Sequence, residues 1–430
     1  MVFTSAAYWG DVVPFVPIAN ELVRRGHDVV YCVPQGHHDL LRQERFSLAD
    51  AGVPFSPRDL RHDATHERMV AQYGLRLAGA VLGRYYLATF TVAYLDAIVA
   101  RTREALAGAD LMVTHPTVGV STGIAADQAG VPWITGHLFP MMLPSLERAP
   151  WTLPLPVPRN AAGRVLARVL WFGARFVIGR IMFDRQINAY RNERGLPPIE
   201  AVAAFGGVSP RRTLLLSSRH YVDVPADWAE RGIDVTGFTP WDGPAGPTVP
   251  GEVSAFLDAG APPVLVTLGT AASAAGSQAF HVVAAALDEL GLRGLFLVGP
   301  ESDLRAADLP GLTAVAPFAP LASVLPRCSA IVQAGGHGTS AAAMLAGVPS
   351  VIVPFLFDQL WHGRRITELG LGRLVRRWRR GHTLRRAIAD VTTDPIYGER
   401  CLRMARRLAT EDGVGAACDA IEACLEGRSG

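Results

Sequence analysis

The sequence predicts an α/β protein with two parallel-sheet domains joined by a linker. Three observations support this prediction. Short apolar strands alternate with helices in the first half of the chain, the same alternation restarts in the second half, and a stretch rich in proline and glycine separates the two runs. That stretch is residues 239–251, so we expect an N-terminal domain over 1–238 and a C-terminal domain over 252–430. The last helix is expected to pack back on the N-terminal domain.

The first run opens with a β-loop-α-β unit. We expect a strand over 1–5, a loop over 6–11 and a helix from about Pro14, since proline suits a first helical turn. The helix should end near residue 25, before a glycine. Further elements of this run are strand 28–33, strand 110–114, helix 118–129, strand 131–136 and strand 213–217.

The second run repeats the pattern after the linker. Its expected elements are strand 263–267, helix 278–290, strand 295–298, strand 330–332, helix 339–346 and strand 350–353. Ligands of such Rossmann-like domains bind at the carboxyl ends of the parallel strands. Two such edges facing each other across a cleft would hold a donor on one side and an acceptor on the other.

Composition excludes several classes of protein. Of 430 residues, 49% are apolar and 19% are charged, which is typical of globular domains, and a net charge of +2 gives no support for a nucleic-acid partner. The five cysteines show no CxxC pair or zinc-like spacing, which favours reduced thiols and a cytoplasmic location. Neither a signal peptide nor a membrane span is evident, because arginines interrupt the apolar runs.

The segment 331–339 (IVQAGGHGT) is the main indication of a ligand. A glycine-rich turn between a strand and a helix brings backbone N–H groups and the positive end of the helix close to an anion, and a diphosphate fits this description. A tight turn with no ligand would have the same pattern. Further on, Asp358 and Gln359 follow strand 350–353, where an acid and an amide can bind sugar hydroxyls. The alternative is that Asp358 caps the next helix.

This part of the chain resembles the family 1 glycosyltransferases, which include natural-product, macrolide and sterol glycosyltransferases. The matching residues are Gly335, Gly336, Gly338, Thr339, Gly347, Val348, Pro349, Pro354, Phe355, Asp358 and Gln359. The resemblance implies the GT-B fold, with donor phosphates on Gly336, His337, Gly338 and Thr339 and the donor sugar on Asp358 and Gln359. It also implies that Gly269 and Thr270 reach the phosphates and that Phe318 lies beside the nucleobase. The family usually has a histidine where this chain has Ala334, and we hypothesise that His337 partly takes its role.

The opening segment, with Trp9, Gly10 and Asp11 before Pro14, resembles the first motif of the same family. An acceptor hydroxyl must lose its proton as it attacks, and one well-placed base suffices. The resemblance implies that Asp11 is this base, whereas its spacing also allows it to cap the helix near Pro14. Trp9 is an acceptor-side candidate.

Two histidines that follow predicted strands are further acceptor-side candidates. These are His115 and His137, and His115 could pair with Asp11. For each, the alternative is a histidine satisfied within its own loop.

The segment 150–185 begins with prolines and continues as a helix with two stripes. One stripe holds Arg164, Arg168 and Arg175, and the other holds Val165, Val169, Phe172 and Phe176. Three interpretations stay open, namely an apolar pocket for a lipophilic acceptor, weak peripheral contact with an anionic membrane, and an ordinary amphipathic surface helix.

Together these features predict an inverting glycosyltransferase. It would move a hexose or deoxyhexose from a UDP- or TDP-sugar to a hydroxyl of a lipophilic small molecule, without a metal, as a monomer or homodimer. A sugar-nucleotide epimerase or a lipid-linked precursor transferase fits the Asp358–Gln359 pair poorly, and an oxidoreductase would need the GxGxxG that the first strand lacks. The alternative is a non-catalytic auxiliary protein that activates a partner transferase.

Overall fold

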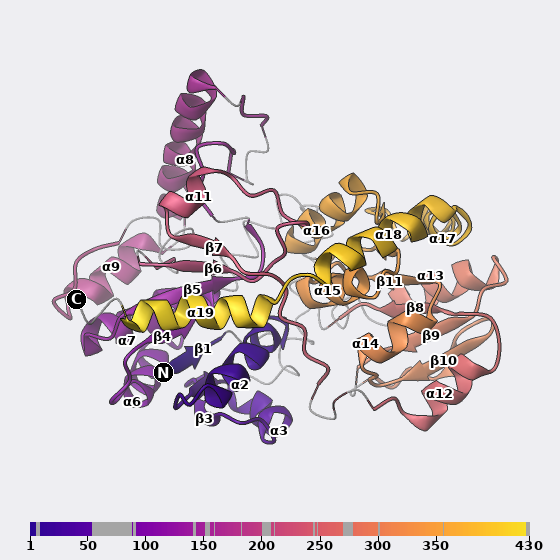
Figure 1. Cartoon of the computed structure of the whole chain (residues 1–430), viewed down its shortest axis with the longest axis horizontal. Helices are drawn as coiled ribbons and strands as arrows, with labels where there is room; N and C mark the ends of the chain where they lie inside the picture. Colours follow the sequence, from indigo (N-terminus) through magenta and orange to yellow (C-terminus); the bar gives the residue numbers. More distant parts are fainter. Residues whose placement is uncertain are drawn as a thin grey trace. The chain divides into compact units, whose positions relative to one another are not determined.

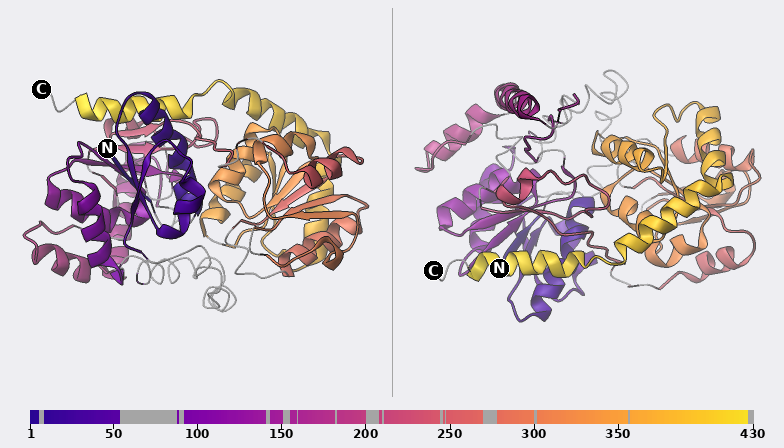
Figure 2. Two further views of the ribbon diagram at one scale, coloured as in Figure 1. Left: turned by 90° about the horizontal axis from the view of Figure 1, so that it is seen from below. Right: turned by 45° about the horizontal axis from the view of Figure 1, so that its top comes forward.

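The fold consists of two compact units, each with a parallel sheet. The computed structural model describes residues 1–5, 9–53, 88, 92–140, 143–150, 155–158, 160–181, 183–199, 208–209, 211–243, 246, 248–269, 278–299, 302–355 and 357–426. Unit 1 contains the described residues up to Thr239 and from Asp412 onward, and unit 2 contains those from Pro240 to Glu411. In each unit helices lie on both faces of the sheet (Figures 1 and 2). The predicted α/β class with two Rossmann-like parallel sheets is confirmed.

The sheet of unit 1 has the strand order β3-β2-β1-β4-β5-β6-β7, and all its neighbouring strands are parallel. The order reverses between β1 and β4, so the carboxyl ends of these two strands flank the switch point at which ligands bind in such sheets. The strands are β1 (Val2–Thr4), β2 (Val30–Val33), β3 (Ser47–Asp50), β4 (Met112–Thr114), β5 (Trp133–His137), β6 (Thr213–Leu215) and β7 (Ile233–Val235).

Alternating side chains of these strands face two cores. Val2 of β1 and Cys32 of β2 pack with helices α6, α7 and α9, whereas Phe3 and Tyr31 point to the opposite face, where Phe3 contacts Phe15. The helices of unit 1 are α1 (Trp9–Val12), α2 (Val16–Arg24), α3 (His38–Leu41), α6 (Leu95–Ala105), α7 (Pro116–Ala129), α8 (Ala161–Ile181), α9 (Asp184–Asn192), α11 (Asp227–Glu230) and α19 (Gly413–Glu426), with 3₁₀ turns η1 (Val13–Phe15) and η2 (Gln35–His37).

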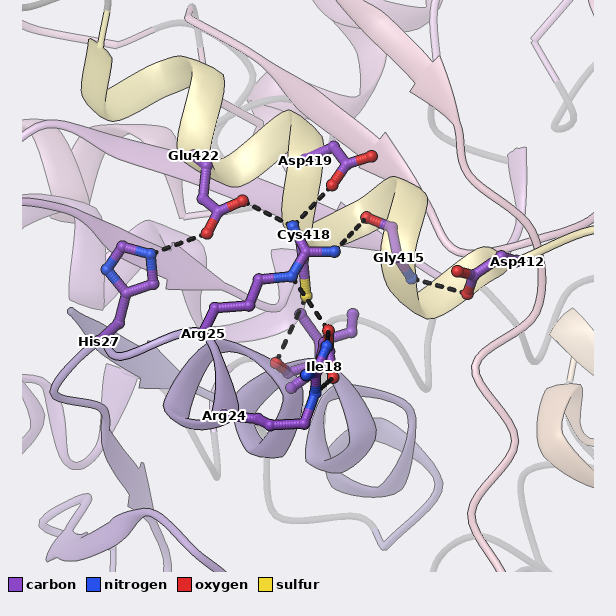
Figure 3. Close-up of polar contacts among 10 residues, drawn as sticks. Ile18, Arg24, Arg25, His27, Asp412, Gly415, Cys418, Asp419 and Glu422 are labelled. Atoms are coloured by element: carbon purple, nitrogen blue, oxygen red, sulfur yellow. Dashed lines mark hydrogen bonds and ion pairs between the residues drawn. The ribbon is translucent and has the colours of Figure 1, made fainter.

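Helix α19, the last in the chain, packs on α2 (Figure 3). The Arg25 guanidinium donates to the carboxylates of Asp419 and Glu422, at 2.6 Å in each case. Glu422 is also 2.9 Å from Nε2 of His27. A Cβ on Gly413 would lie 2.2 Å from the carbonyl oxygen of Phe238, so the chain re-enters unit 1 beside the point where it leaves.

The sheet of unit 2 has the order β10-β9-β8-β11-β12-β13, again parallel throughout, with its switch point between β8 and β11. Helices α13 and α17 cover one face, and α12, α14 and α15 cover the other. The strands are β8 (Val264–Thr267), β9 (Gly294–Leu297), β10 (Thr313–Ala316), β11 (Ala330–Gln333), β12 (Ser350–Ile352) and β13 (Gly372–Leu374). The helices are α12 (Gly251–Asp258), α13 (Gln278–Asp288), α14 (Leu321–Val324), α15 (His337–Leu345), α16 (Phe357–Glu368), α17 (Gly381–Thr393) and α18 (Pro395–Leu408), with 3₁₀ turns η6 (Ala306–Asp308) and η7 (Leu325–Arg327).

Two predicted boundaries matter for the site and need correction. The predicted loop over 6–11 is wrong at its end, because Asp11 lies inside the short helix α1. Helix α15 begins at His337, not at Thr339, because the extended Gly336 acts as its N-cap. His337, Gly338 and Thr339 therefore form the first turn of a helix whose leading N–H groups have no partner within the helix.

Candidate active site

At the carboxyl edge of the unit 1 sheet, Asp11 and His115 flank the switch point. Asp11 follows β1, His115 follows β4, and His115 Nε2 lies 3.6 Å from Asp11 Oδ1. His115 is also the N-cap of α7, since its Nδ1 accepts the backbone N–H of Thr117 at 3.4 Å. A ring whose Nδ1 is an acceptor carries its proton on Nε2 when neutral, and that nitrogen faces Asp11. The capping contact thus favours the tautomer of His115 in which the proton is on Nε2, the nitrogen that faces the Asp11 carboxylate.

Burial shifts the pKa values of this pair in opposite directions. Loss of hydration raises the pKa of Asp11 to about 7 and lowers the pKa of His115 to about 3. His115 is therefore neutral at pH 7, whereas Asp11 titrates there. The Asp11 side chain is still 22% exposed, so it is not sealed within the core. A partly exposed carboxylate with a pKa near neutral pH has the properties of a general base.

The sequence also suggested that Asp11 caps a helix, and this interpretation is wrong. The residues that precede η1 and α2 are Val12 and Phe15, and neither helix has a side-chain cap. Tyr31, which sequence reasoning missed, helps to hold Asp11 in place. Its hydroxyl donates to the carbonyl of Val12 at 2.9 Å and so fixes the end of α1.

Two further polar groups are buried at this edge. His137 ends β5, and burial together with His115 lowers its pKa to about 3. Among the described residues its Nε2 has no hydrogen-bond partner, and the same holds for the hydroxyl of Ser217, just after the neighbouring strand β6. Such buried groups are costly unless something binds them. Trp9, the other acceptor-side candidate, lies two residues before Asp11 in α1 and packs against the ring of His37 at 5.3 Å.

At the carboxyl edge of unit 2, the glycine turn after β11 combines a tight position with open ones. Gly335 has φ +95°, and a Cβ there would lie 2.8 Å from Ile352 Cγ2, so only glycine fits. Gly336 and Gly338 are different, because a Cβ at either position would meet no atom within 4 Å. Space is therefore left beside the first turn of α15, and the leading N–H groups of a helix are the groups that bind anions at helix N-termini.

Gln333 and Ala334, which precede the turn, are part of the interior. Gln333 is fully buried, donates to Ser350 Oγ at 3.2 Å and accepts from Ser340 Oγ at 3.2 Å. It thereby ties β11 to β12 and α15. Ala334 is 4% exposed and belongs to the core of unit 2. Neither side chain is available to a ligand, which leaves His337 as the imidazole of this turn.

His337 begins α15 and stacks near a second histidine that sequence reasoning missed. Its ring centroid is 5.8 Å from that of His362, which lies in α16. Burial and the neighbouring His337 hold the pKa of His362 well below its usual value, so His362 is neutral. No sequence spacing predicted this pair, because the two residues come from different helices.

Asp358 and Gln359 lie in the first turn of α16, next to the glycine turn. Gln359 Oε1 accepts the backbone N–H of Phe355 at 2.7 Å and so fixes the loop after β12. The backbone of Gln359 also lies close to Gly335, since a Cβ on that glycine would be 3.0 Å from its carbonyl oxygen. Asp358 follows the first residue of α16 and so is not its N-cap, but a carboxylate there is favoured by the helix dipole.

The remaining donor candidates also follow strands of this sheet. Gly269 comes after β8, has φ +64°, and has no atom within 4 Å of a Cβ position. Because β8 pairs with β11, Gly269 and the glycine turn share the switch point. Phe318 follows the edge strand β10 and is 49% exposed. Thr270 lies outside the described residues, and within the described part no cluster of three or more His, Cys, Asp or Glu side chains could hold a metal.

Comparison with known proteins agrees with this geometry. Residues 298–414 match the family described as erythromycin biosynthesis protein CIII-like, C-terminal domain. The chain is 30% identical to the O-mycaminosyltylonolide 6-deoxyallosyltransferase of Streptomyces fradiae. The alignment covers 98% of this chain and 96% of that protein. The chain belongs to the glycosyltransferases of macrolide and antibiotic biosynthesis.

Other relatives of this glycosyltransferase support the same assignment. It is 27% identical to the glycosyltransferase GtfC of Amycolatopsis orientalis, over 86% of this chain and 85% of that protein. Among solved structures, the glycosyltransferase VinC in complex with DTDP aligns over 99% of both chains with a TM-score of 0.68 and 18% identity, which confirms the GT-B fold. In the described part of this glycosyltransferase, no helix has both the length and the apolar character needed to cross a membrane.

Proposed function

We propose that this glycosyltransferase performs an inverting transfer of a hexose or deoxyhexose from a UDP- or TDP-sugar to a hydroxyl of a lipophilic small molecule. The observation that carries the proposal is the open glycine turn at the start of α15. It lies at the switch point of the unit 2 sheet and leaves space at Gly336 and Gly338 next to helix N–H groups.

In this proposal unit 2 binds the donor. The N–H groups of Gly336–Thr339, the Thr339 hydroxyl and His337 hold the diphosphate, assisted by Gly269 and Thr270. Asp358 and Gln359 bind the sugar hydroxyls, and Phe318 lies beside the base. The order of these groups along β10, β8, β11 and β12 supports the assignment, since each follows its strand at the same edge.

Unit 1 activates the acceptor. The acceptor oxygen attacks the anomeric carbon from the side opposite the diphosphate and gives its proton to the carboxylate of Asp11. The bond between that carbon and the phosphate oxygen breaks, and the diphosphate leaves with the electron pair and is stabilised by the N–H groups of α15. His115 holds the Asp11 carboxylate in position through Nε2. His137 and Trp9 contribute to the acceptor side, where the buried Nε2 of His137 suits a polar group of the acceptor.

The relatives narrow the range of donors and acceptors. VinC was solved with DTDP, and the Streptomyces fradiae relative is named as a deoxyallosyltransferase acting on O-mycaminosyltylonolide. We therefore place TDP-deoxyhexoses and macrolide-like acceptors first among the candidates, with UDP-hexoses second. We also place the enzyme in the cytoplasm, as a monomer or homodimer, because its five cysteines are free thiols and four of them are buried.

The test is a panel of UDP- and TDP-sugars in thermal-shift assays, followed by mass spectrometry of reactions with macrolide and other aglycones. We expect one donor class to raise Tm and to yield a product heavier by one sugar. Asp11→Asn is the matched control, since it should keep the donor-induced shift and lose the product. A chain whose Tm no nucleotide sugar raises would contradict the proposal.

One observation favours a second candidate, a non-catalytic auxiliary protein. Ala334 replaces the histidine expected from the resemblance, and it is part of the core. Product formation by the purified chain alone would exclude this candidate. Donor binding with no turnover, recovered only when a partner transferase is added, would support it.

A further inference from the structure

Among the described side chains of helix α8 in unit 1, several large apolar ones are exposed although the buried ones are small. Its buried face consists of small residues, Gly163, Ala167 and Ala174. On the opposite face Val165, Val169 and Phe172 are 56%, 61% and 73% exposed. A surface helix normally buries such residues and exposes polar ones. Figure 1 shows α8 projecting away from the unit 1 sheet.

This face is the main apolar patch in the described part of the chain. The described part of the chain has ten exposed large hydrophobic side chains. Five of them lie within residues 155–172, namely Leu155, Val165, Leu166, Val169 and Phe172. The other five are scattered over both units. Single exposed apolar residues are ordinary, but a group of this kind marks a surface that contacts a protein partner or a membrane.

The charged residues of helix α8 itself are all arginines. From Arg148 to Phe183 the chain contains six arginines and no aspartate or glutamate. Arg164 and Arg168 are exposed, and at about 100° per residue they form a row beside Val165 and Val169 rather than on the buried face. An apolar row flanked by arginines, on a helix that contains no aspartate or glutamate, complements a surface that is both apolar and anionic.

We propose that the exposed face of α8 binds the surface of an anionic membrane. The helix would lie in the interface, with Phe172 and the valines in the acyl boundary and the arginines at the phosphate groups. A second copy of the chain is a poorer occupant, because a twofold contact would place two unopposed arginine rows next to each other. This contact is peripheral and does not depend on the proposed transfer reaction.

The experiment is co-sedimentation of the full chain with vesicles of phosphatidylcholine alone or mixed with phosphatidylglycerol. We expect binding only to the mixed vesicles, and a loss of most binding at about 1 M salt, where the Debye length falls to about 3 Å. Phe172→Gln should weaken binding about tenfold without changing charge. Leu312→Gln is the matched control in unit 2, since Leu312 is 69% exposed, and it should bind like the parent chain. The double variant Arg164→Gln/Arg168→Gln should lose the preference for phosphatidylglycerol.

Three results would overturn the proposal. The first is no binding to mixed vesicles at low salt by the folded parent chain, and the second is equal binding by the parent and Phe172→Gln. The third is a dimer in solution that Phe172→Gln converts to a monomer, since a second copy would then cover the row. Thermal unfolding of each variant confirms that it is folded, and because Phe172 is exposed its Tm should match that of the parent.

Discussion

The carboxyl edges of the two sheets occupy equivalent places in their units but are lined by different kinds of chemical group. In unit 1 the switch point is lined by two titratable side chains, the partly exposed Asp11 and the buried His115, whose pKa values are shifted by loss of hydration. In unit 2 it is lined by the first turn of α15, where Gly336 and Gly338 leave space and where we propose that backbone N–H groups bind the donor. The unit 1 edge contains a carboxylate that can accept or release a proton near neutral pH, whereas the backbone N–H groups at the unit 2 edge do not titrate.

Because of this difference, substitutions at the two edges should affect different properties of the enzyme. Loss of a titratable group at the unit 1 edge should abolish turnover and leave binding intact. Crowding of the unit 2 edge should weaken binding and leave the chemistry of the bound complex intact. Five predictions test this contrast.

The largest effect is expected for Asp11→Asn. Removal of a general base lowers kcat by about 10²- to 10⁴-fold, and the donor Kd should stay the same because the donor groups are in unit 2. For the parent chain, kcat/KM should rise about tenfold per pH unit below pH 7 and level off above it, since only the ionised carboxylate accepts a proton. Full activity of Asp11→Asn, or a profile flat between pH 5 and 8, would refute the assignment.

The same variant should be more stable than the parent at alkaline pH. The folded-state pKa of Asp11 is raised from 3.8 to about 7, so between these values the folded protein holds a proton that the unfolded chain has lost. The free energy of unfolding of the parent therefore falls as the pH rises through this window. Asp11→Asn removes this loss, and we expect a gain on the order of 2 kcal/mol at pH 8 and little difference at pH 3.5, measured by urea unfolding.

Next in size is the effect of Gly338→Ala on the donor site. The added methyl group would meet no protein atom, and alanine in a helix stabilises it by about 0.5–1 kcal/mol relative to glycine. It would stand where the phosphates bind, so the donor Kd should rise about 10- to 100-fold, the worth of one charge-assisted hydrogen bond. Titration calorimetry and thermal unfolding measure both quantities.

Gly335→Ala is the matched control for Gly338→Ala, because Gly335 has φ +95° and no room for a Cβ. It should lower Tm. A Gly338→Ala enzyme with unchanged donor affinity would show that the phosphates bind elsewhere.

A smaller effect is expected for His115→Asn. Asparagine retains the N-cap of α7 and so the fold, but loses the Nε2–H that faces Asp11. We expect kcat to fall about tenfold and the pH midpoint of kcat/KM to rise above that of the parent, since an N–H group directed at the carboxylate from 3.6 Å stabilises its charged form. An unchanged midpoint would mean that His115 only caps the helix. Thr117→Val, which leaves Nε2 in place, serves as the control.

The smallest effect is expected for His337→Ala. A single neutral hydrogen bond is worth about 0.5–1.5 kcal/mol, so the donor Kd should rise about 2- to 12-fold with little change in kcat. Calorimetry with the nucleoside diphosphate alone isolates the phosphate contact. If the affinity of His337→Ala equals that of the parent, the turn binds its anion through backbone groups and Thr339 only.

The elements predicted from sequence are those whose signal is local. The central strands and the glycine turn were predicted because apolar runs, glycines and prolines mark them directly. The four edge strands β3, β7, β10 and β13 were not, since they are three or four residues long and only partly buried. The sequence suggested that His115 could pair with Asp11, and the pairing of β1 with β4 brings the two together. The role of His115 as the N-cap of α7 was not predicted. The same is true of His362 and of the buried Ser217, which neighbouring elements bring to the site.

The position of Gly413 against Phe238 has a consequence for dissecting the molecule. The described part of unit 2 is one continuous stretch, residues 240–411, and the chain leaves unit 1 after Thr239 and returns to it at Asp412, where Gly413 lies against Phe238. Excising that piece and joining Thr239 to Asp412 with a short linker would keep every described element of unit 1, including α19 and its Arg25 contacts. A simple truncation after residue 411 would instead strip a helix from the unit that carries Asp11. Gene fusions and domain exchanges in this chain should therefore use two junctions, one after Thr239 and one before Asp412.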